Sequence, residues 1–418
     1  MKKKNVIITF LICLIIIVLG ISIYMYKVYS KVKNFDGYIY PTVKINGMDM
    51  SGETIKQAKE ILENKYQKPI DNKKINVKVN DKIYTINYSE LNLKYDIDKV
   101  VNEAFNYAKD KNIIDKYKLI KDPVIKPMKL PFTYNPKHID DVINRIKLDV
   151  NSEPKNGAIQ KTGAMGVAQF AVKPDKDGYK LKDGELKTNI IASINGEISQ
   201  DTTVQANIET LKASKTKEKL QGINTLISTY STIYGPISSP GRANNIQLAT
   251  RAINGLVLMP GETFSFNGVV GERTEAKGYQ SAPVDIGNAT SMGLGGGICQ
   301  VSTTLYNSVI RAGIKSTVRM HHSIPSTYVP LGYDATVSFD NLDYQFKNTL
   351  NFPIYIEAGS ANGNETFNIY SDVSSLSKTY KLSSDVSSDG KNVKVYLQTY
   401  QNGAMVSNDL IVNDTYNN

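Results

Sequence analysis

Cysteine, histidine and tryptophan are scarce in this chain. Its 418 residues include two cysteines, three histidines and no tryptophan. Cys13 lies in an apolar run near the N-terminus, so Cys299 is the only thiol in the rest of the sequence. A single thiol cannot form an intramolecular disulfide, and it is too few for a structural zinc site. Cys299 is therefore either a buried, inert thiol or a nucleophile with a base nearby.

An uncharged apolar segment occupies residues 5–26, directly after three lysines at positions 2–4. It is long enough to cross the hydrocarbon core of a cell membrane as a helix. The lysines favour a cytoplasmic N-terminus, a single-pass topology and an extracytoplasmic location for the rest of the chain. A cleaved signal peptide is the alternative, but no Ala-x-Ala cleavage pattern follows. We expect a cytoplasmic tip and membrane anchor over residues 1–27 and a spacer over residues 28–40.

The charge balance is basic, with 50 Lys and Arg against 40 Asp and Glu and a net charge of +10. At the outer face of a membrane, such a charge suggests affinity for anionic polymers or lipid headgroups. A solvated lysine-rich surface explains the charge equally well. Nucleic acid is disfavoured as a partner, because no clustered Arg and aromatic pattern occurs. No metal or cofactor is expected.

Residues 41–225 alternate short predicted strands with short helices. Residues 75–79 and 82–86 alternate as a hairpin, residues 183–194 have helical spacing, and residues 151–166 are predicted to form a loop. This pattern predicts one small α+β module, or a duplicated pair. No group of catalytic residue types occurs in this region.

The character of the sequence changes at about residue 226, where glycine-containing turns become dense. A helix is predicted over residues 301–312, with Cys299 at its start. Alternating strands are predicted after this helix, over residues 336–339, 344–346, 354–357 and 366–370. Residues 226–372 are therefore expected to form an α+β domain with a mostly antiparallel sheet, followed by a β-hairpin extension over residues 373–418.

The position of Cys299 suits a nucleophile. Free N–H groups and the positive end of the helix dipole lower the pKa of a thiol at a helix start. Glycines allow a substrate to approach the backbone closely, and nearby N–H groups can face a developing oxyanion. His321 or His322 is expected to act as the base, and Asp334 as the group that orients it. The inert alternative stays open on spacing alone. The residues of the expected oxyanion and substrate loop are Gly295, Gly296, Gly297 and Gln300.

Residues 226–370 resemble a VanW domain, and residues 40–200 resemble, more loosely, the YoaR-like peptidoglycan-binding domains that often precede it. The looser match rests on residues 46–58 and the order of elements. The VanW-like motifs are Ser231–Thr232, Arg242–Ile246, Pro260–Asn267, Gly271–Thr274, Gly278–Tyr279, Gly295–Tyr306, Arg319–Ser323, Tyr328–Thr336 and Phe346–Asn348.

This resemblance implies an activity. VanW domains have been proposed to act as cysteine L,D-transpeptidases that cross-link peptidoglycan. Cys299 matches the family's cysteine, and His322 matches its histidine and is therefore the expected base. Arg319 and Asp334 match further motif positions and are candidate catalytic residues. The implied partners are peptidoglycan stem peptides and glycan, with the membrane bound through the N-terminal helix. Two alternatives remain: an NlpC-like cysteine hydrolase of stem peptides, and a non-catalytic wall-binding or scaffolding protein.

Overall fold

The computed structural model describes residues 2–194, 201–286, 289–339 and 341–417. The chain forms two compact units, and it passes between them three times. The first unit comprises residues 1–153 and 179–211, and the second comprises residues 154–178 and 212–418. Each unit is therefore built from separate stretches of sequence.

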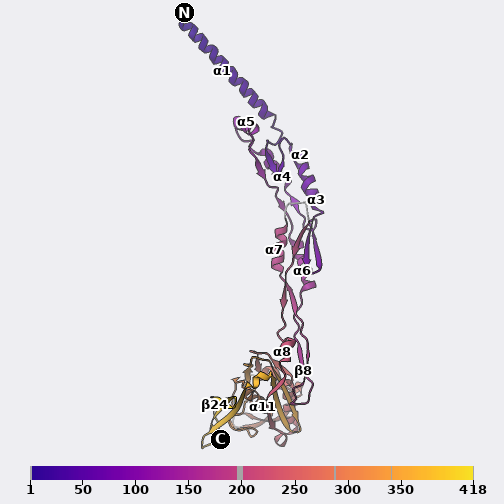
Figure 1. Cartoon of the computed structure of the whole chain (residues 1–418), viewed down its shortest axis with the longest axis vertical. Helices are drawn as coiled ribbons and strands as arrows, with labels where there is room; N and C mark the ends of the chain where they lie inside the picture. Colours follow the sequence, from indigo (N-terminus) through magenta and orange to yellow (C-terminus); the bar gives the residue numbers. More distant parts are fainter. Residues whose placement is uncertain (1, 195–200, 287–288, 340, 418) are drawn as a thin grey trace. The chain divides into compact units, whose positions relative to one another are not determined.

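The first unit begins with a long apolar helix, α1 (Lys2–Lys33), which is drawn in indigo in Figure 1. Among the described residues it is the one helix long and apolar enough to cross a membrane. It extends into the segment for which a spacer is expected, and Val28 and Val32 in its last turns are buried. The predicted hairpin is confirmed, with Val79 opposite Lys82 in the register of β3 and β4.

Most of the other elements of the first unit surround one apolar core, whereas residues 113–120 pack with Val32 and Tyr40 in a second, smaller cluster. These other elements are short. They are β1 (Val43–Ile45), β2 (Met48–Asp49), α2 (Ile55–Leu62), α3 (Lys68–Ile70), β3 (Lys74–Val79), β4 (Lys82–Asn87), β5 (Lys94–Tyr95), α4 (Ile97–Asn106), α5 (Ile113–Lys121), β6 (Lys126–Met128), β7 (Phe132–Thr133), α6 (Lys137–Val150), β10 (Gly178–Leu181), α7 (Asp183–Ser193), β11 (Thr202–Gln205) and β12 (Ile208–Leu211). The predicted helix over residues 183–194 is thus confirmed as α7.

The second unit contains larger, antiparallel sheets, as predicted. Its elements are β8 (Ala158–Lys161), β9 (Phe170–Lys173), α8 (Lys217–Gln221), β13 (Thr225–Ile233), α9 (Pro240–Ile253), β14 (Leu256–Leu258), β15 (Thr263–Ser265), α10 (Phe266–Val270), β16 (Ser281–Ile286), β17 (Ala289–Leu294), α11 (Ile298–Arg311), β18 (Ser316–Val318), β19 (Gln345–Lys347), β20 (Ile354–Ala361), β21 (Asn364–Ser371), β22 (Lys378–Val386), β23 (Asn392–Gln401) and β24 (Ala404–Thr415). The strand β8 lies where a loop is expected, because its partner β9 pairs with it in this unit.

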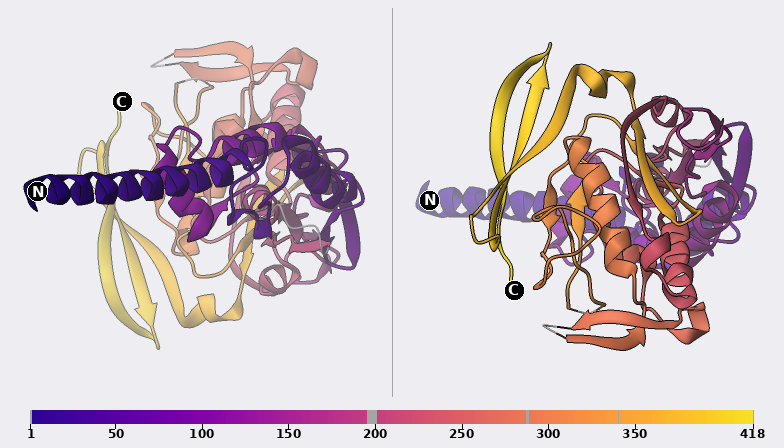
Figure 2. Two further views of the ribbon diagram at one scale, coloured as in Figure 1. Left: turned by 90° about the horizontal axis from the view of Figure 1, so that it is seen from above. Right: turned by 90° about the horizontal axis from the view of Figure 1, so that it is seen from below.

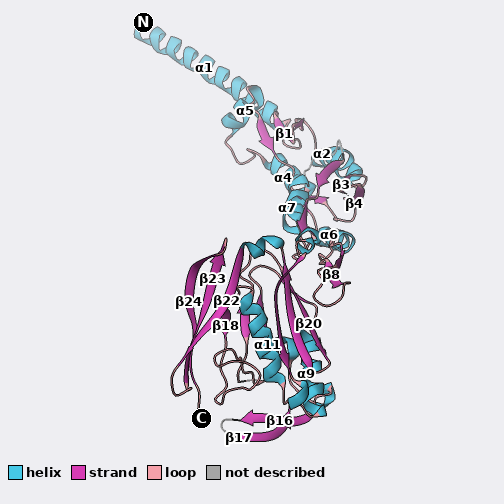
Figure 3. Cartoon of the chain, turned by 60° about the horizontal axis from the view of Figure 1, so that its bottom comes forward, coloured by secondary structure: helices cyan, strands magenta, loops and turns pink. Residues whose placement is uncertain are grey.

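Helix α11 is central to the second unit. A four-stranded sheet in the order β13-β21-β20-β14 lies on one side of it, and the sheet β22-β23-β24 lies on the other (Figure 3). A third sheet, β15-β19-β18, contributes Phe264 and Phe346 to the core. Their rings stack with the ring centroids 4.9 Å apart. The two-stranded arm β16-β17 projects from the unit and leads directly into α11 (Figure 2). This arrangement fixes the helix that carries Cys299 from several sides.

Candidate active site

Helix α11 starts directly after the glycine run. Its N-cap is Gly297, whose φ of 100° lies in the left-handed region that favours glycine, and Cys299 lies in the first turn, as predicted. Gly296 has no room for a side chain, because a Cβ there would lie 2.4 Å from the carbonyl oxygen of Pro283 in β16. The glycines are therefore required for the close packing that places the thiol.

The burial of α11 singles out Cys299. Ile298 and every residue from Gln300 to Ile310 are buried, whereas Cys299 is partly exposed. The sequence predicts one buried apolar face on this helix, but the polar faces of the helix are buried as well. Cys299 is thus the one position in this stretch of the helix that solvent reaches.

Buried polar side chains of α11 hold the loop that carries Asp334. Asn307 donates to the carbonyl oxygen of Tyr333 at 2.6 Å, and Ser302 donates to the carbonyl oxygen of Ala335 at 2.6 Å. Asp334 is therefore fixed on both sides along the chain. The strand predicted over residues 336–339 is wrong: the backbone there is a loop with one isolated bridge, at Ser338.

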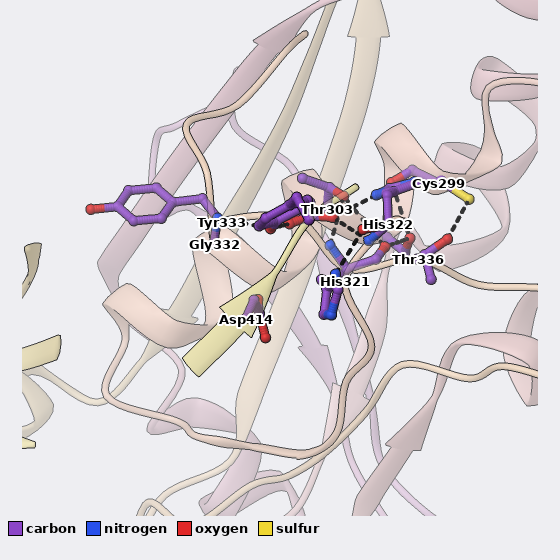
Figure 4. A network of polar contacts seen from close by, with 12 residues as sticks. Cys299, Thr303, His321, His322, Gly332, Tyr333, Thr336 and Asp414 are labelled. Carbon is purple, nitrogen blue, oxygen red and sulfur yellow. Dashed lines mark hydrogen bonds and ion pairs between the residues drawn. The ribbon is translucent and has the colours of Figure 1, made fainter. Parts of the chain in front are cut away.

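Cys299, His322 and Asp334 lie together as a set, because His322 bonds the Asp334 carboxylate and is drawn beside Cys299 in Figure 4. The His322 Nδ1 lies 2.6 Å from Asp334 Oδ2, and the His322 backbone N–H donates to the same oxygen at 2.7 Å. Because Nδ1–H donates to a carboxylate, the other ring nitrogen remains for proton exchange, and the nearby imidazole lowers the pKa of the Cys299 thiol. His322 lies in a loop after β18, not on a strand.

The electrostatics of the set favour a thiolate and an imidazolium. Burial raises the pKa of the Cys299 thiol, but the interaction with His322 and the hydrogen bonds with Thr336 and Val337 together outweigh it, so the net pKa is lowered. Burial lowers the pKa of His322, yet its bonds to Asp334 and Cys299 raise it to about 10. Burial raises the pKa of Asp334, but hydrogen bonds from His322 and Tyr416 bring it to about 2. Each group therefore supports the charged form of its neighbour.

The two histidines have different surroundings. The Nδ1–H of His321 donates to the carbonyl oxygen of His322 at 2.7 Å, and its ring lies 4.9 Å from that of Tyr416. In Figure 4, His322 is beside Cys299 and His321 lies farther from the sulfur. His138 is in the first unit, where its ring nitrogen lies 3.1 Å from Glu90. His322 is therefore the histidine that the structure brings to the thiol.

Two other predicted residues lie next to the set but do not face the sulfur. Arg319 donates to the carbonyl oxygen of Asp334 at 2.7 Å, and it pairs with the Asp334 carboxylate at 3.4 Å. The buried Gln300 side chain donates to Thr232 at 2.9 Å and accepts from Arg242 at 2.8 Å. Within the described ranges, no group of three or more His, Cys, Asp or Glu side chains is arranged to hold a metal ion.

Three further residues at the site were missed from the sequence. The Thr336 hydroxyl lies 3.4 Å from the Cys299 sulfur, and Tyr416 and Asp414 contact Asp334 and Arg319 from the far end of the chain. Thr336 could have been predicted from the sequence, since it is the last residue of the motif that contains Asp334. The other two had none, because only tertiary structure brings the last strand to this loop.

Comparison with known families identifies both parts of the chain. The family described as "VanW like protein" matches residues 241–370. The family described as "Putative peptidoglycan binding domain" matches residues 84–203, N-terminal to the first match. No solved structure matches the chain.

Two curated relatives carry the comparison further. The chain is 36% identical over 229 residues to the uncharacterized protein YoaR of Bacillus subtilis strain 168, which covers 55% of this chain and 73% of YoaR. It is 30% identical over 125 residues to the vancomycin B-type resistance protein VanW of Enterococcus faecalis strain ATCC 700802 / V583, which covers 28% of this chain and 45% of that protein. The chain therefore belongs to the family of VanW-like proteins, with a domain of the putative peptidoglycan-binding type preceding its VanW-like domain.

Proposed function

We propose that this protein is a membrane-anchored, cysteine-dependent L,D-transpeptidase that cross-links peptidoglycan stem peptides. The observation that carries the proposal is the Cys299–His322–Asp334 set, in which the only thiol outside α1 lies beside an imidazole that a buried carboxylate orients. Cysteine acyl transfer requires this combination of nucleophile, base and orienting group. The family relation supports a role at the cell wall, and the peptidoglycan-binding domain supports peptidoglycan as the partner.

The first step forms a thioester. The Cys299 thiolate attacks the carbonyl carbon of the third residue of a tetrapeptide stem, and the amide bond to the terminal D-alanine breaks. The His322 imidazolium gives its proton to the departing amine, and free D-alanine leaves. Asp334 Oδ2 accepts a hydrogen bond from His322 Nδ1 at 2.6 Å. The other ring nitrogen is therefore the one that transfers the proton.

The second step resolves the thioester. An amine on a neighbouring stem loses a proton to His322 and attacks the thioester carbonyl, which forms the new amide and releases the Cys299 thiolate. Cys299's own backbone N–H is our candidate oxyanion donor, because the N–H groups of Ile298 and Gln300 donate to carbonyl oxygens of the glycine run at 3.2 and 3.1 Å. The Gly295 to Gly297 backbone packs against Arg273, Pro283 and Arg242, so in this proposal the glycines place the thiol and do not line the path of the stem.

Arg319 has a supporting role in this proposal. Its guanidinium bonds the carbonyl oxygen and the carboxylate of Asp334, and it does not approach the thiol through any hydrogen bond among the described residues. It holds Asp334 in place, which in turn holds His322. We therefore assign it a positioning role.

The remainder of the chain would keep the site near its polymer. Helix α1 serves as an uncleaved, single-pass anchor with its N-terminus in the cytoplasm, and the peptidoglycan-binding domain raises the local concentration of stem peptides. Mass measurement of the membrane-extracted protein tests the anchor. A protein that lacks the α1 residues would indicate a cleaved signal peptide instead.

A product assay tests the function. The full-length protein in detergent is incubated with disaccharide-tetrapeptides, and the products are separated by mass. We expect cross-linked dimers and free D-alanine from the wild type, and a loss of at least about 10³-fold for Cys299→Ala, since the nucleophile is removed. Cys13→Ala is the matched control and should keep full activity, because Cys13 lies in α1.

The alternatives are separate outcomes of the same assay. Shortened monomers without dimers would mean that water resolves the thioester, as in an NlpC-like hydrolase. Full activity in Cys299→Ala would remove the thiol from the mechanism. No product from the wild type, combined with binding to intact peptidoglycan, would indicate a non-catalytic wall-binding protein.

A further inference from the structure

The end of the chain reaches the carboxylate that orients His322. Tyr416 follows β24 directly, and its hydroxyl donates to Asp334 Oδ1 while accepting from the Gly332 N–H at 2.9 Å. Its ring packs against His321, with the ring centroids 4.9 Å apart. Tyr416 is 2% exposed and Asp334 is 1% exposed, so water does not replace this bond. One hydroxyl therefore ties the last part of the chain to both ends of the loop segment 332–334.

A second contact comes from the same sheet. Asp414, in β24, pairs with Arg319 Nη1 at 2.6 Å, and Arg319 Nη2 lies 3.4 Å from Asp334 Oδ1. The two oxygens of Asp334 are thus divided. Oδ2 takes the ring and backbone N–H groups of His322, and Oδ1 takes Tyr416 and Arg319. The carboxylate cannot rotate without breaking bonds on both sides.

We propose that Tyr416 is a positioning residue of the Cys299–His322–Asp334 set, which makes the C-terminal sheet β22-β23-β24 part of the active site. These residues lie beyond residues 241–370, which match the VanW-like family, so the family region alone does not contain the complete site. The inference rests on the proposed function only in requiring His322 to act on Cys299. It does not depend on which acyl group is transferred.

A pH profile tests this role, because the charge of the set is what Tyr416 would control. The groups that face Asp334 are His322, Arg319 and Tyr416, and Tyr306 and Tyr328 sense its charge from further away. The groups whose charge is coupled to Cys299 are His322, Arg273 and Tyr328. The arginines and tyrosines keep their charge states across pH 4–9, so the profile in that range reports the Cys299–His322–Asp334 set.

The experiment uses the full-length chain with Cys13→Ala, so that Cys299 is the only thiol. The rate of alkylation by iodoacetamide is measured by mass at pH 4–10. Tyr416→Phe keeps the ring and removes the hydroxyl. We expect the midpoint of the profile to move to higher pH, which slows alkylation about three- to tenfold below the midpoint. Above pH 9.5 the two rates should be equal, because the free thiolate reacts in both proteins.

Tyr400→Phe is the matched control. Tyr400 lies in β23 of the same sheet, and its hydroxyl donates to Gln398 at 3.0 Å, away from the site. Its profile should coincide with that of the parent protein. The proposal would be overturned by a Tyr416→Phe profile that coincides with that of the parent protein or moves to lower pH. It would also be overturned if the alkylation rate changed only because the variant unfolds at a lower temperature. A shifted profile in a protein that makes no peptidoglycan product would uphold this inference and reject the transferase.

Discussion

At the scale of single residues, Asp334 sets the chemistry of a thiol that it does not touch. Its carboxylate accepts from His322, and His322 in turn lowers the pKa of the Cys299 thiol. The carboxylate stabilises the imidazolium, and the imidazolium stabilises the thiolate. The reactivity of Cys299 is therefore expected to depend on a side chain two steps away from the sulfur.

The first residue-scale prediction concerns Asp334→Asn. The pKa of Cys299 is lowered in the folded protein, so the thiolate persists as pH falls until the lowered value is reached. Without the carboxylate, the imidazolium is less stable and the thiol pKa rises toward its usual value. We expect alkylation at pH 6 to slow by about 10-fold or more and to be unchanged above pH 9.5. Iodoacetamide labelling of the Cys13→Ala protein measures this.

The control for that variant is Asp409→Asn. Asp409 lies in β24 and forms an exposed ion pair with Lys315 at 3.0 Å. Removing it changes the net charge by the same amount without reaching the site. If both variants showed the parent profile, Asp334 would have no electrostatic role in thiol activation.

At the scale of elements, α11 has a second polar network on the side that faces β21. Glu365 is fully buried, and its carboxyl lies 2.5 Å from the Thr250 hydroxyl and 3.2 Å from that of Thr304. Both hydroxyls also lie 2.7 Å from helix carbonyl oxygens, of Ile246 and Gln300. Each hydroxyl has one hydrogen for these two oxygen neighbours, so a protonated Glu365 supplies one of the two missing donors. Burial raises its pKa to about 7, which agrees with this count.

The element-scale prediction follows from that pKa. A carboxyl whose pKa is raised from 4.5 to about 7 contributes stability below pH 4.5 that is lost as the pH rises through 7. We expect the free energy of unfolding of the second unit to fall by about 3 kcal/mol from this group between pH 4.5 and pH 8. Glu365→Gln should remove that loss. Urea unfolding at the two pH values measures it.

Glu275→Gln is the control, because Glu275 is an exposed residue of the same unit. It should leave the pH dependence of unfolding as it is in the parent. An unchanged pH dependence in Glu365→Gln would show that Glu365 is ionised in the folded protein. The hydroxyls of Thr250 and Thr304 would then be the donors in their contacts with Glu365.

The sequence predicted those parts of the structure that depend on neighbouring residues. The start of α11 was predicted from local spacing, and the β-hairpin expected in the extension over residues 373–418 is present as β23 and β24. The loop at residues 334–337 was not predicted, because its hydrogen bonds come from α11 rather than from a neighbouring strand. Tyr416 was missed for the same reason, since 82 residues separate it from Asp334.

At the scale of the whole molecule, residues 154–178 belong to the VanW-like unit although they interrupt the sequence of the other unit. Lys161, at the end of β8, pairs with Glu357 of β20 at 2.9 Å, with both side chains 10% exposed. Phe170 packs edge-on against Tyr355 and Tyr370 of the main sheet. The inserted hairpin is therefore a structural part of this unit.

The prediction at this scale compares two ion pairs. Lys161→Met leaves the buried Glu357 carboxylate without its cation, and we expect the second unit to lose about 3 kcal/mol of unfolding free energy. Lys315→Met breaks the exposed pair with Asp409, whose side chains are 55% and 46% exposed, and should cost less than about 1 kcal/mol. Chemical unfolding of both variants gives the comparison. If the two variants lost the same unfolding free energy, the β8-β9 hairpin would contribute little to the stability of the second unit.

The three crossings between the units also bear on how such a protein can be inherited. A recombination breakpoint anywhere between residues 178 and 212 would separate Glu357 from Lys161 and deliver a VanW-like unit with an unneutralised carboxylate in its interior. Exchange of the two units as independent cassettes is thereby penalised. Lineages that carry this insertion are expected to pass on both units together, as a single heritable block.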